Sequence, residues 1–381
     1  MRFFYVDPGL WHNLGHHANS CRYITRELRA RGVETRVFAF AQVEPALRAE
    51  LGAVPLFRWY TYEIGDRDPI CGWLNSYLVG GQATREDLGR IPDVGPGDLL
   101  YLNSGQATQL FGLAQWLAVL PAVVRPRVAF EFGVDPGMDV QQMPGNVQLT
   151  VRDPRQDPRA VLTRHAGGQI PQAAAPRVHL ATFEPNASGA YQALLGKPVT
   201  VLPLPRRAVT DLRSRAGRRP ITVSVLGHQR GEKGYQHMPE VARRVLAVGR
   251  DVKLLAHNGA PGVMEQTQRE MRALAAADSR LILDERVADD KIWAELLDAS
   301  DLIVCPYNPG RFAISYSAVA AEAIANSIPL VVPAHTSMDR LMREFGGGGT
   351  TFERDDPPSI AEATLRAIDR FDEIAALAAA G

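Results

Sequence analysis

Residues 221–240 read ITVSVLGHQRGEKGYQHMPE and set a strand, a glycine loop and a helix in direct succession. Ile221, Val223 and Val225 stand at alternate positions, which predicts a buried strand that is broken at Gly227. Beyond the loop, apolar residues recur at helical spacing. A strand that passes through a short loop into a helix is the building unit of parallel sheets. The stretch therefore predicts the α/β fold class.

The loop inside this stretch carries the side chains of His228, Arg230 and Lys233. Backbone N–H groups at a helix start, together with two fixed cations, can neutralise a phosphate dianion. In an open parallel sheet, ligands lie beyond the carboxyl ends of the strands. The loop is therefore a candidate site for a nucleotide diphosphate. Taken alone, a solvated loop without a ligand explains it equally well.

A second informative segment, residues 300–333, reads SDLIVCPYNPGRFAISYSAVAAEAIANSIPLVVP. It predicts a strand over 302–305, a loop rich in Pro, Gly and Asn, an Ala-rich helix over about 315–326 and a further strand up to 332. Glu322 is the lone charge of that helix. Because unpaired burial of a carboxylate is costly, Glu322 either faces solvent or has a specific partner, such as a pair of ribose hydroxyls.

Together the two segments resemble the C-terminal half of GT-B fold glycosyltransferases, specifically the retaining family 4 type. That family has an Arg and a Lys in a glycine loop between a strand and a helix, and later a Glu-Ala pair on a helix. The matching residues are Gly227, Arg230, Lys233, Gly234, Pro306, Glu322-Ala323 and Pro329-Leu330-Val331-Val332. The resemblance implies two Rossmann-like doubly wound domains that face a central cleft.

The resemblance covers the whole chain in outline and implies a domain organisation. Residues 1–205 would form an acceptor-side domain, 206–220 a linker and 221–357 a nucleotide-sugar donor domain. Residues 358–381 would form a C-terminal helix that can pack back on the first domain.

The implied activity is transfer of a sugar from a UDP- or GDP-type nucleotide sugar to a glycan, lipid or small-molecule acceptor, with retention, as in polysaccharide biosynthesis. No cofactor or metal is implied, because Arg230 and Lys233 would stabilise the departing diphosphate. Glu322 would hold the ribose. The residues implied to line the donor site are Gly15, Gly227, His228, Arg286, Val287, Ser315, Tyr316, Ser317 and Glu322.

The sequence departs from the family pattern at Ile314. The family has a further Glu eight positions before the one that matches Glu322, and here Ile314 occupies that position. Because the earlier Glu normally contacts the donor sugar, sugar recognition is expected to shift to Ser315, Tyr316, Ser317 or backbone groups.

Glu131, at the end of the predicted strand 127–132, is the candidate catalytic residue of the first half. The family often has a His at a comparable strand end, directed at the donor sugar. Glu131 could bind sugar hydroxyls, act as a weak base, or cap the next segment.

Residues 7–17, DPGLWHNLGHH, follow the first predicted strand, and the resemblance favours Gly15 as a phosphate neighbour. His12 and His16 could bind a metal if the stretch were helical, but Gly9 and Gly15 favour a loop. Two interpretations of the histidines in this loop stay open: they contact a substrate, or they are ordinary loop residues without a function.

Two other motifs predict neither a metal site nor a phosphate site. The string Asp66-Arg67-Asp68 precedes Pro69, which indicates a turn rather than a metal site. The glycines at 346–349 are interpreted as the exit from a helix over 338–345 rather than a phosphate cradle.

The chain has 381 residues, 46% of them hydrophobic, which fits two α/β domains. With 42 basic and 42 acidic residues, its charge balance excludes a general affinity for nucleic acid. The basic run at 206–219 is interpreted as a solvated linker, with an anionic membrane surface as the alternative.

Three cysteines lie far apart and predict neither a disulfide framework nor a zinc site. The N-terminus is not a signal peptide, and the apolar run 110–124 is too short to span a bilayer. These observations predict a cytoplasmic protein, at most peripheral to the inner face of the membrane.

The remaining pattern alternates strands and helices. Strands are predicted over 2–6, 34–40, 97–103, 127–132, 178–183, 199–202, 221–226, 252–256, 280–283, 302–305 and 330–332. Helices are predicted over about 15–31, 107–120, 187–195, 238–248, 264–277, 291–297, 315–326 and 359–380. Residues 60–90 are assigned no more than a short helix.

Two alternative functions stay open. One is a nucleotide-sugar epimerase or hydrolase on the same fold, which would turn over its donor without an acceptor. The other is a non-catalytic interaction module, which Ile314 makes conceivable because it removes the usual carboxylate.

Overall fold

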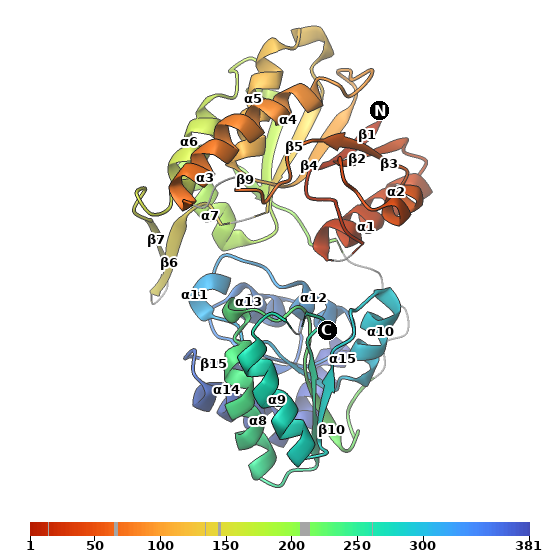
Figure 1. Cartoon of the computed structure of the whole chain (residues 1–381), viewed down its shortest axis with the longest axis vertical. Coiled ribbons are helices and arrows are strands. Elements are labelled where there is room, and N and C mark those ends of the chain that lie inside the picture. The colour runs from red at the N-terminus through yellow and green to blue at the C-terminus, as the bar shows by residue number, and fades with distance from the viewer. Residues whose placement is uncertain (14, 65–67, 134, 144–145, 206–213, 261) are drawn as a thin grey trace. The chain divides into compact units, whose positions relative to one another are not determined.

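The computed structural model describes residues 1–13, 15–64, 68–133, 135–143, 146–205, 214–260 and 262–381. The chain divides into two compact units, Met1–Arg206 and Arg207–Gly381. Each unit contains its own parallel sheet with helices around it (Figure 1). The α/β fold class predicted from the sequence is confirmed.

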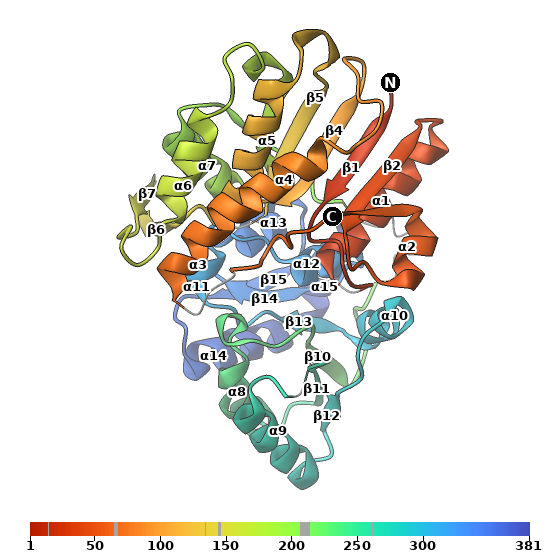
Figure 2. The ribbon, with the colours of Figure 1, turned by 45° about the horizontal axis from the view of Figure 1, so that its top comes forward.

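The first unit is built on a seven-stranded parallel sheet in the order β3-β2-β1-β4-β5-β8-β9. Its strands are β1 (Phe3–Asp7), β2 (Thr35–Phe40), β3 (Ala53–Phe57), β4 (Leu99–Gly105), β5 (Arg127–Phe132), β8 (Val178–Thr182) and β9 (Val199–Val201). Strands β2, β1, β4 and β5 lie side by side in Figure 2. A separate antiparallel hairpin joins β6 (Met138–Met143) to β7 (Asn146–Val151).

Helices cover both faces of this sheet. They are α1 (His16–Ala30), α2 (Pro45–Leu51), α3 (Pro69–Asn75), α4 (Gly81–Leu88), α5 (Ala107–Val119), α6 (Arg159–Gly168) and α7 (Pro185–Leu195). Tyr5 of β1 packs with Cys21 of α1 and Leu47 of α2, whereas Phe4 points to the opposite face against Phe38. Burial on both faces explains why β1 is a continuous apolar run.

The second unit is built on a six-stranded parallel sheet in the order β12-β11-β10-β13-β14-β15. Its strands are β10 (Ile221–Val225), β11 (Val252–His257), β12 (Leu281–Asp284), β13 (Leu302–Val304), β14 (Leu330–Pro333) and β15 (Gly349–Phe352). Its helices are α8 (Met238–Ala247), α9 (Glu265–Ala277), α10 (Asp290–Ala299), α11 (Pro309–Phe312), α12 (Ala318–Ala325), α13 (Ser337–Glu344), α14 (Pro357–Asp369) and α15 (Phe371–Ala380).

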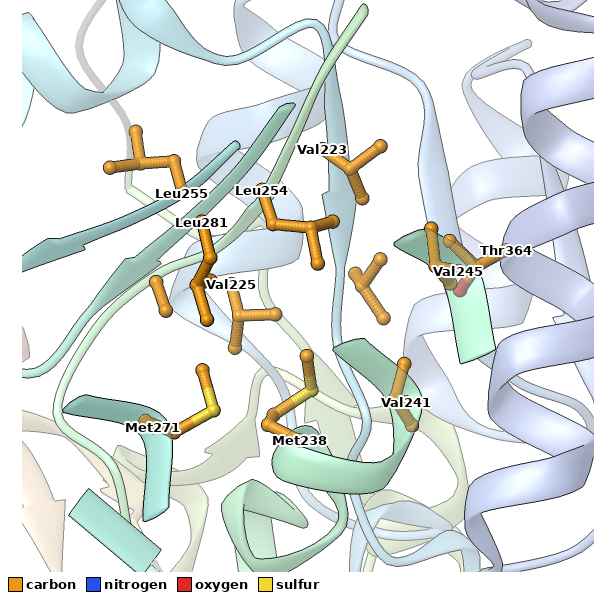
Figure 3. Close-up of a pocket in the computed structure, with 12 residues that line it drawn as sticks. Val223, Val225, Met238, Val241, Val245, Leu254, Leu255, Met271, Leu281 and Thr364 are labelled. Atoms are coloured by element: carbon orange, nitrogen blue, oxygen red, sulfur yellow. The ribbon is translucent and has the colours of Figure 1, made fainter. Parts of the chain in front are cut away.

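Alternate residues of these strands enter two cores, as expected for a doubly wound unit. Val223 and Val225 pack with α8 and α14, whereas Leu226 and Ile303 pack with α10, α12 and α13. Figure 3 shows the first of these cores, where the side chains surround a cavity of about 10 Å³. Because its lining is almost wholly apolar, this cavity is a packing void rather than a ligand site.

The glycine run at 346–349 contains both the predicted exit from a helix and the start of a strand that was not predicted. Gly349 begins the edge strand β15, and a Cβ added there would overlap the Leu330 carbonyl oxygen of β14. A Cβ on Gly348 would overlap the Ile374 carbonyl oxygen of α15. Gly346, with φ 64°, leads the chain out of α13 as predicted, whereas Gly348 and Gly349 permit close backbone packing at the start of β15.

Several short elements were absent from the sequence-based assignment. They are α2, β3, the paired strands β6 and β7, α6, α11 and β15. Between residues 60 and 90, where no more than a short helix was assigned, the structure has α3, a π-helical turn (Ser76–Gly80) and α4. Helix α2 has seven residues, too few to establish a periodicity; Pro45 starts it and Gly52 ends it in the left-handed conformation.

The described part of the basic run, residues 214–219, is exposed at most positions but contains one buried arginine. The Arg215 guanidinium is buried and donates to the Asp298, Ser300 and Leu297 carbonyl oxygens at the end of α10. The Arg218 guanidinium donates a 3.1 Å hydrogen bond to the Asp301 carboxylate. These arginines satisfy carbonyl groups that a helix end leaves without partners. Residues 206–213 lie outside the described part of the chain.

The C-terminal segment is helical, as predicted, but forms two helices. Ile360 of α14 and Phe371 and Ile374 of α15 belong to the core of the second unit. The expected contact of this segment with the first unit stays a prediction. None of the helices in the described part of the chain is long and apolar enough to cross a membrane.

Candidate functional site

The loops that follow β10 and β13 meet at the carboxyl edge of the second sheet. The Asn308 backbone N–H donates a 3.0 Å hydrogen bond to the Glu232 carbonyl oxygen. The Lys233 ammonium nitrogen lies 5.5 Å from the centroid of the Tyr307 ring, within cation–π range. Strand order reverses between β10 and β13, so these loops flank the switch point at which open α/β sheets bind ligands.

Gly234 allows the two loops to approach each other. Its φ is 67°, and a Cβ added there would overlap the Pro306 carbonyl oxygen. At Gly227, where φ is 106°, a Cβ would lie 3.3 Å from Val319 Cγ2 and 3.7 Å from Lys233 Nζ. Gly227, Lys233 and the first turn of α12 therefore border one small region.

Lys233 brings a half-buried charge to this region. Burial first, and then the positive charge of Arg230, lower the pKa of the Lys233 ammonium to about 8. In the described part of the chain, Lys233 forms no ion pair with a carboxylate. An anionic ligand would compensate both the burial and the repulsion from Arg230.

Two further basic side chains surround Lys233. Arg230 is exposed, and its Nε lies 3.3 Å from the Glu232 carboxylate. Desolvation, followed by the charges of Arg230 and Lys233, lowers the pKa of His228. The loop thus concentrates more positive than negative charge, which favours a multiply charged anion.

The helix N–H groups expected beside Lys233 do not come from α8. Two 3₁₀ turns, Gly231–Lys233 and Tyr235–His237, separate the loop from Met238, where α8 begins. The N-terminus that borders Gly227 is that of α12, where the Ser317 hydroxyl accepts a 3.2 Å hydrogen bond from the Ala320 N–H.

The cap at Ser317 explains why α12 starts later than predicted. Ser315, Tyr316 and Ser317 lie in the loop before the helix, and Ser317 is the N-cap. Ile314 is buried in the same segment. Glu322 is half-buried in the middle of α12, where its carbonyl oxygen accepts hydrogen bonds from Asn326.

Arg286 and Val287 follow β12 at the same sheet edge. The Arg286 guanidinium is occupied by ion pairs to Asp284 at 2.6 Å and to Glu295 at 3.2 Å. Its carbonyl oxygen lies 2.9 Å from His257 Nε2. Val287 is 61% exposed, so an apolar surface is available there to a ligand.

His257 was not among the residues selected from the sequence. It ends β11, next to β10, and its Nδ1 lies 3.3 Å from the Gly227 backbone nitrogen. A signal was present, since the polar residues His257 and Asn258 directly follow the predicted strand 252–256, at the strand end where parallel sheets place ligand-binding groups.

Glu131 lies in the first unit and has no exposed surface. Its Oε2 accepts a 2.6 Å hydrogen bond from the Ser104 N–H, at a register shift between β4 and β5. Burial raises the pKa of the Glu131 carboxyl to about 8. The contact supports the irregular end of β4, whereas a catalytic role for Glu131 stays a prediction.

The histidines after β1 contact other side chains of the first unit, and His16 and His17 share the Tyr62 hydroxyl. His12 lies 3.1 Å from the Glu44 carboxylate, and His17 Nδ1 lies 2.9 Å from both oxygens of the buried Asp7. His17 Nε2 lies 2.9 Å from the Tyr62 hydroxyl. Gly15, with φ 86°, precedes the first residue of α1, so the helix does not extend back to His12.

Asp68 is the described member of the Asp66-Arg67-Asp68 string, and its carboxylate caps α3 by accepting from the Cys71 N–H at 2.8 Å. Asp66 and Arg67 lie outside the described residues. Within the residues that the structure describes, no group of three or more His, Cys, Asp or Glu side chains could hold a metal ion.

Two doubly wound units, each with its strand order reversed beside the first strand, define the GT-B fold, and comparisons with solved structures agree. Anabaena Alr3699/HepE in complex with UDP is 14% identical and has a TM-score of 0.60, covering 100% of this chain and 93% of that one. Sucrose-phosphate synthase from Thermosynechococcus elongatus is 12% identical, with a TM-score of 0.60 and coverage of 99% and 92%.

The lipopolysaccharide outer core galactosyltransferase WaaB, in its apo form, is also 12% identical, with a TM-score of 0.61 and coverage of 99% and 94%. No family model matches the sequence, and no curated protein matches it. At these identities the similarity establishes the GT-B fold.

Proposed function

We propose that this protein is a glycosyltransferase that moves a hexosyl group from a UDP- or GDP-type nucleotide sugar to a glycan, lipid or small-molecule acceptor, with retention and without a metal ion. The carrying observation is Lys233, a half-buried cation at the switch point of the second sheet without a carboxylate ion pair in the described chain. Structures of this fold in complex with UDP and UDP-glucose support the proposal. A cytoplasmic location near the membrane face, and a role in polysaccharide biosynthesis, belong to the same proposal.

The proposed donor site assigns a task to each element around Gly227. Lys233 and Arg230 stabilise the negative charge of the leaving diphosphate, and the α12 N-terminus adds backbone N–H donors. Glu322 accepts hydrogen bonds from the ribose. The loop before α12 contacts the sugar, and the acceptor binds the first unit.

The test has two stages. First, the thermal stability of the full chain is measured with UDP, GDP, ADP and CDP, because a ligand that binds only the folded state raises the melting temperature. Release of nucleotide from the matching sugar donors is then measured with and without a panel of acceptors. Stabilisation by a diphosphate together with acceptor-dependent turnover supports the proposal; no stabilisation by any of them contradicts it.

The buried Ile314 favours a second candidate, a non-catalytic module that binds nucleotide. An apolar side chain there cannot accept hydrogen bonds from a sugar. Tight nucleotide binding with no turnover under any acceptor would identify this function, whereas turnover without any acceptor would identify an epimerase or hydrolase.

The Glu322→Gln variant should weaken UDP or GDP binding about tenfold, because a carboxylate accepts stronger hydrogen bonds from two hydroxyls than an amide does. Calorimetry measures the effect, with Glu270→Gln on the exposed face of α9 as a matched control. Equal affinity in both variants and the wild type would place Glu322 outside the ribose site.

Turnover should persist in EDTA, because Arg230 and Lys233 supply the charge that a divalent ion supplies in other enzymes. Rates are compared in EDTA, Mg²⁺ and Mn²⁺. Complete loss of turnover in EDTA, with recovery in Mn²⁺, would refute the metal-independent mechanism.

A further inference from the structure

His257 connects two loops that border the proposed donor site. It is 2% exposed, and its ring lies between the Gly227 N–H, 3.3 Å from Nδ1, and the Arg286 carbonyl oxygen, 2.9 Å from Nε2. The Gln229 side-chain amide donates a 3.0 Å hydrogen bond to the His257 carbonyl oxygen. Both ring nitrogens and the backbone of His257 are therefore engaged.

These partners allow only one protonation state of the ring. A backbone N–H can only donate, so Nδ1 must present its lone pair to Gly227. A carbonyl oxygen can only accept, so Nε2 must carry the proton that points to Arg286. The ring is therefore neutral, in the Nε2–H tautomer.

The His257 ring also has close packing neighbours. The Trp293 ring meets it edge-on, with centroids 6.5 Å apart and planes at 65°. On another side, a Cβ added to Gly259 would lie 3.5 Å from the His257 ring and 3.2 Å from the Arg286 carbonyl oxygen. The absence of a side chain at Gly259 therefore leaves room for the ring and for its hydrogen bond to Arg286.

We propose that His257 is a positioning residue of the donor site. Through its two ring nitrogens it connects Gly227, at the start of the phosphate loop (residues 227–234), to the loop that contains Arg286 and Val287. The proposal rests on the proposed function, because the ligand served is a nucleoside diphosphate. His257 acts through Gly227, whose backbone borders the Lys233 ammonium.

The Gly227 contact matters because this residue has a φ of 106°. Its N–H is directed at His257, which fixes the orientation of the peptide bond between Leu226 and Gly227. If this hydrogen bond is lost, the peptide gains freedom at the point where the diphosphate is expected. Nucleotide affinity should then fall although no ligand contact has been removed.

Two conservative variants separate the two hydrogen bonds. In His257→Asn, the side-chain oxygen can take the place of Nδ1 and accept from Gly227, but nothing reaches Arg286. In His257→Gln, the amide nitrogen can take the place of Nε2 and donate to Arg286, but the Gly227 partner is lost. Dissociation constants for UDP and GDP are measured at pH 7.5 on the full chain.

The expected pattern is specific to positioning through Gly227. The dissociation constant should rise about tenfold in His257→Gln and His257→Ala, and less than about threefold in His257→Asn. If all variants bind as the wild type does, the positioning role is refuted while the proposed function stands. If the wild type binds neither nucleotide, the proposed function itself fails.

A measurement on the unmodified protein keeps the proposal testable if the variants do not fold. Nitrogen-15 NMR of the imidazole rings reports the tautomer of each histidine, and the ring with the slowest exchange with solvent should be His257. The Nε2–H tautomer, unchanged when UDP is added at pH 7.5, supports the proposal. An Nδ1–H tautomer or an imidazolium at that pH overturns it.

Discussion

Replacing Lys233 with alanine is expected to lower turnover by roughly 10²–10³, the loss that follows removal of one preorganised group that stabilises developing charge. Arg230→Ala should have an effect in the same range. The folded state should survive, because Lys233 makes no ion pair in the described chain and its removal relieves the burial of a charge. Steady-state release of nucleotide measures the effect, and Lys253→Ala, on the exposed side of β11, is the matched control.

The same residue predicts a pH dependence. Because the Lys233 pKa is lowered to about 8, its ammonium is charged below that pH and loses its charge as the pH rises through it. Affinity for UDP should therefore decrease between about pH 7 and 9 in the wild type. In Lys233→Arg the guanidinium stays charged, so this decrease should disappear.

The double variant Arg230→Ala/Lys233→Ala tests both cations together. Full turnover in this variant would refute the proposed diphosphate site.

Replacing Gly234 with alanine is expected to destabilise the second unit by about 2–5 kcal/mol, since the left-handed conformation and the overlap with Pro306 add their penalties. Nucleotide binding should be lost with it, because the phosphate loop would move away from Tyr307. Urea unfolding followed by tryptophan fluorescence measures the stability. Gly231→Ala is the matched control, since a Cβ there meets no atom within 4 Å.

A result in which both glycine variants unfold at the same urea concentration as the wild type would show that the two loops can separate freely. It would also show that the contact between Lys233 and the Tyr307 ring does not depend on the close approach of the two loops at Gly234. Nucleotide affinity that survives in Gly234→Ala would contradict the proposed site even if stability falls.

Most long elements could be predicted because their signals are local. The strands β5 and β10 and the helices α5 and α8 are long apolar or amphipathic runs, and their ends agree with the structure within one or two residues. Helix α2 has only seven residues, too few to establish a helical periodicity, and Pro55 interrupts the strand pattern of β3. The glycines of 346–349 were recognised as a helix exit, but the close packing of Gly348 and Gly349 against α15 and β14 leaves no mark in the sequence.

The sequence by itself determined the α/β fold and the two segments that carry the candidate donor site, because strand alternation, glycine loops and a lone Glu322 are local properties. Only the tertiary structure decided which groups meet. In the structure Lys233 lies beside the Tyr307 ring, and Glu131 is buried in the first unit with a hydrogen bond to the Ser104 N–H. The Arg286 guanidinium forms an ion pair with Asp284. The tertiary structure also brought His257 between two loops that are far apart in the sequence, since the neighbours of a strand end depend on sheet order rather than on chain order.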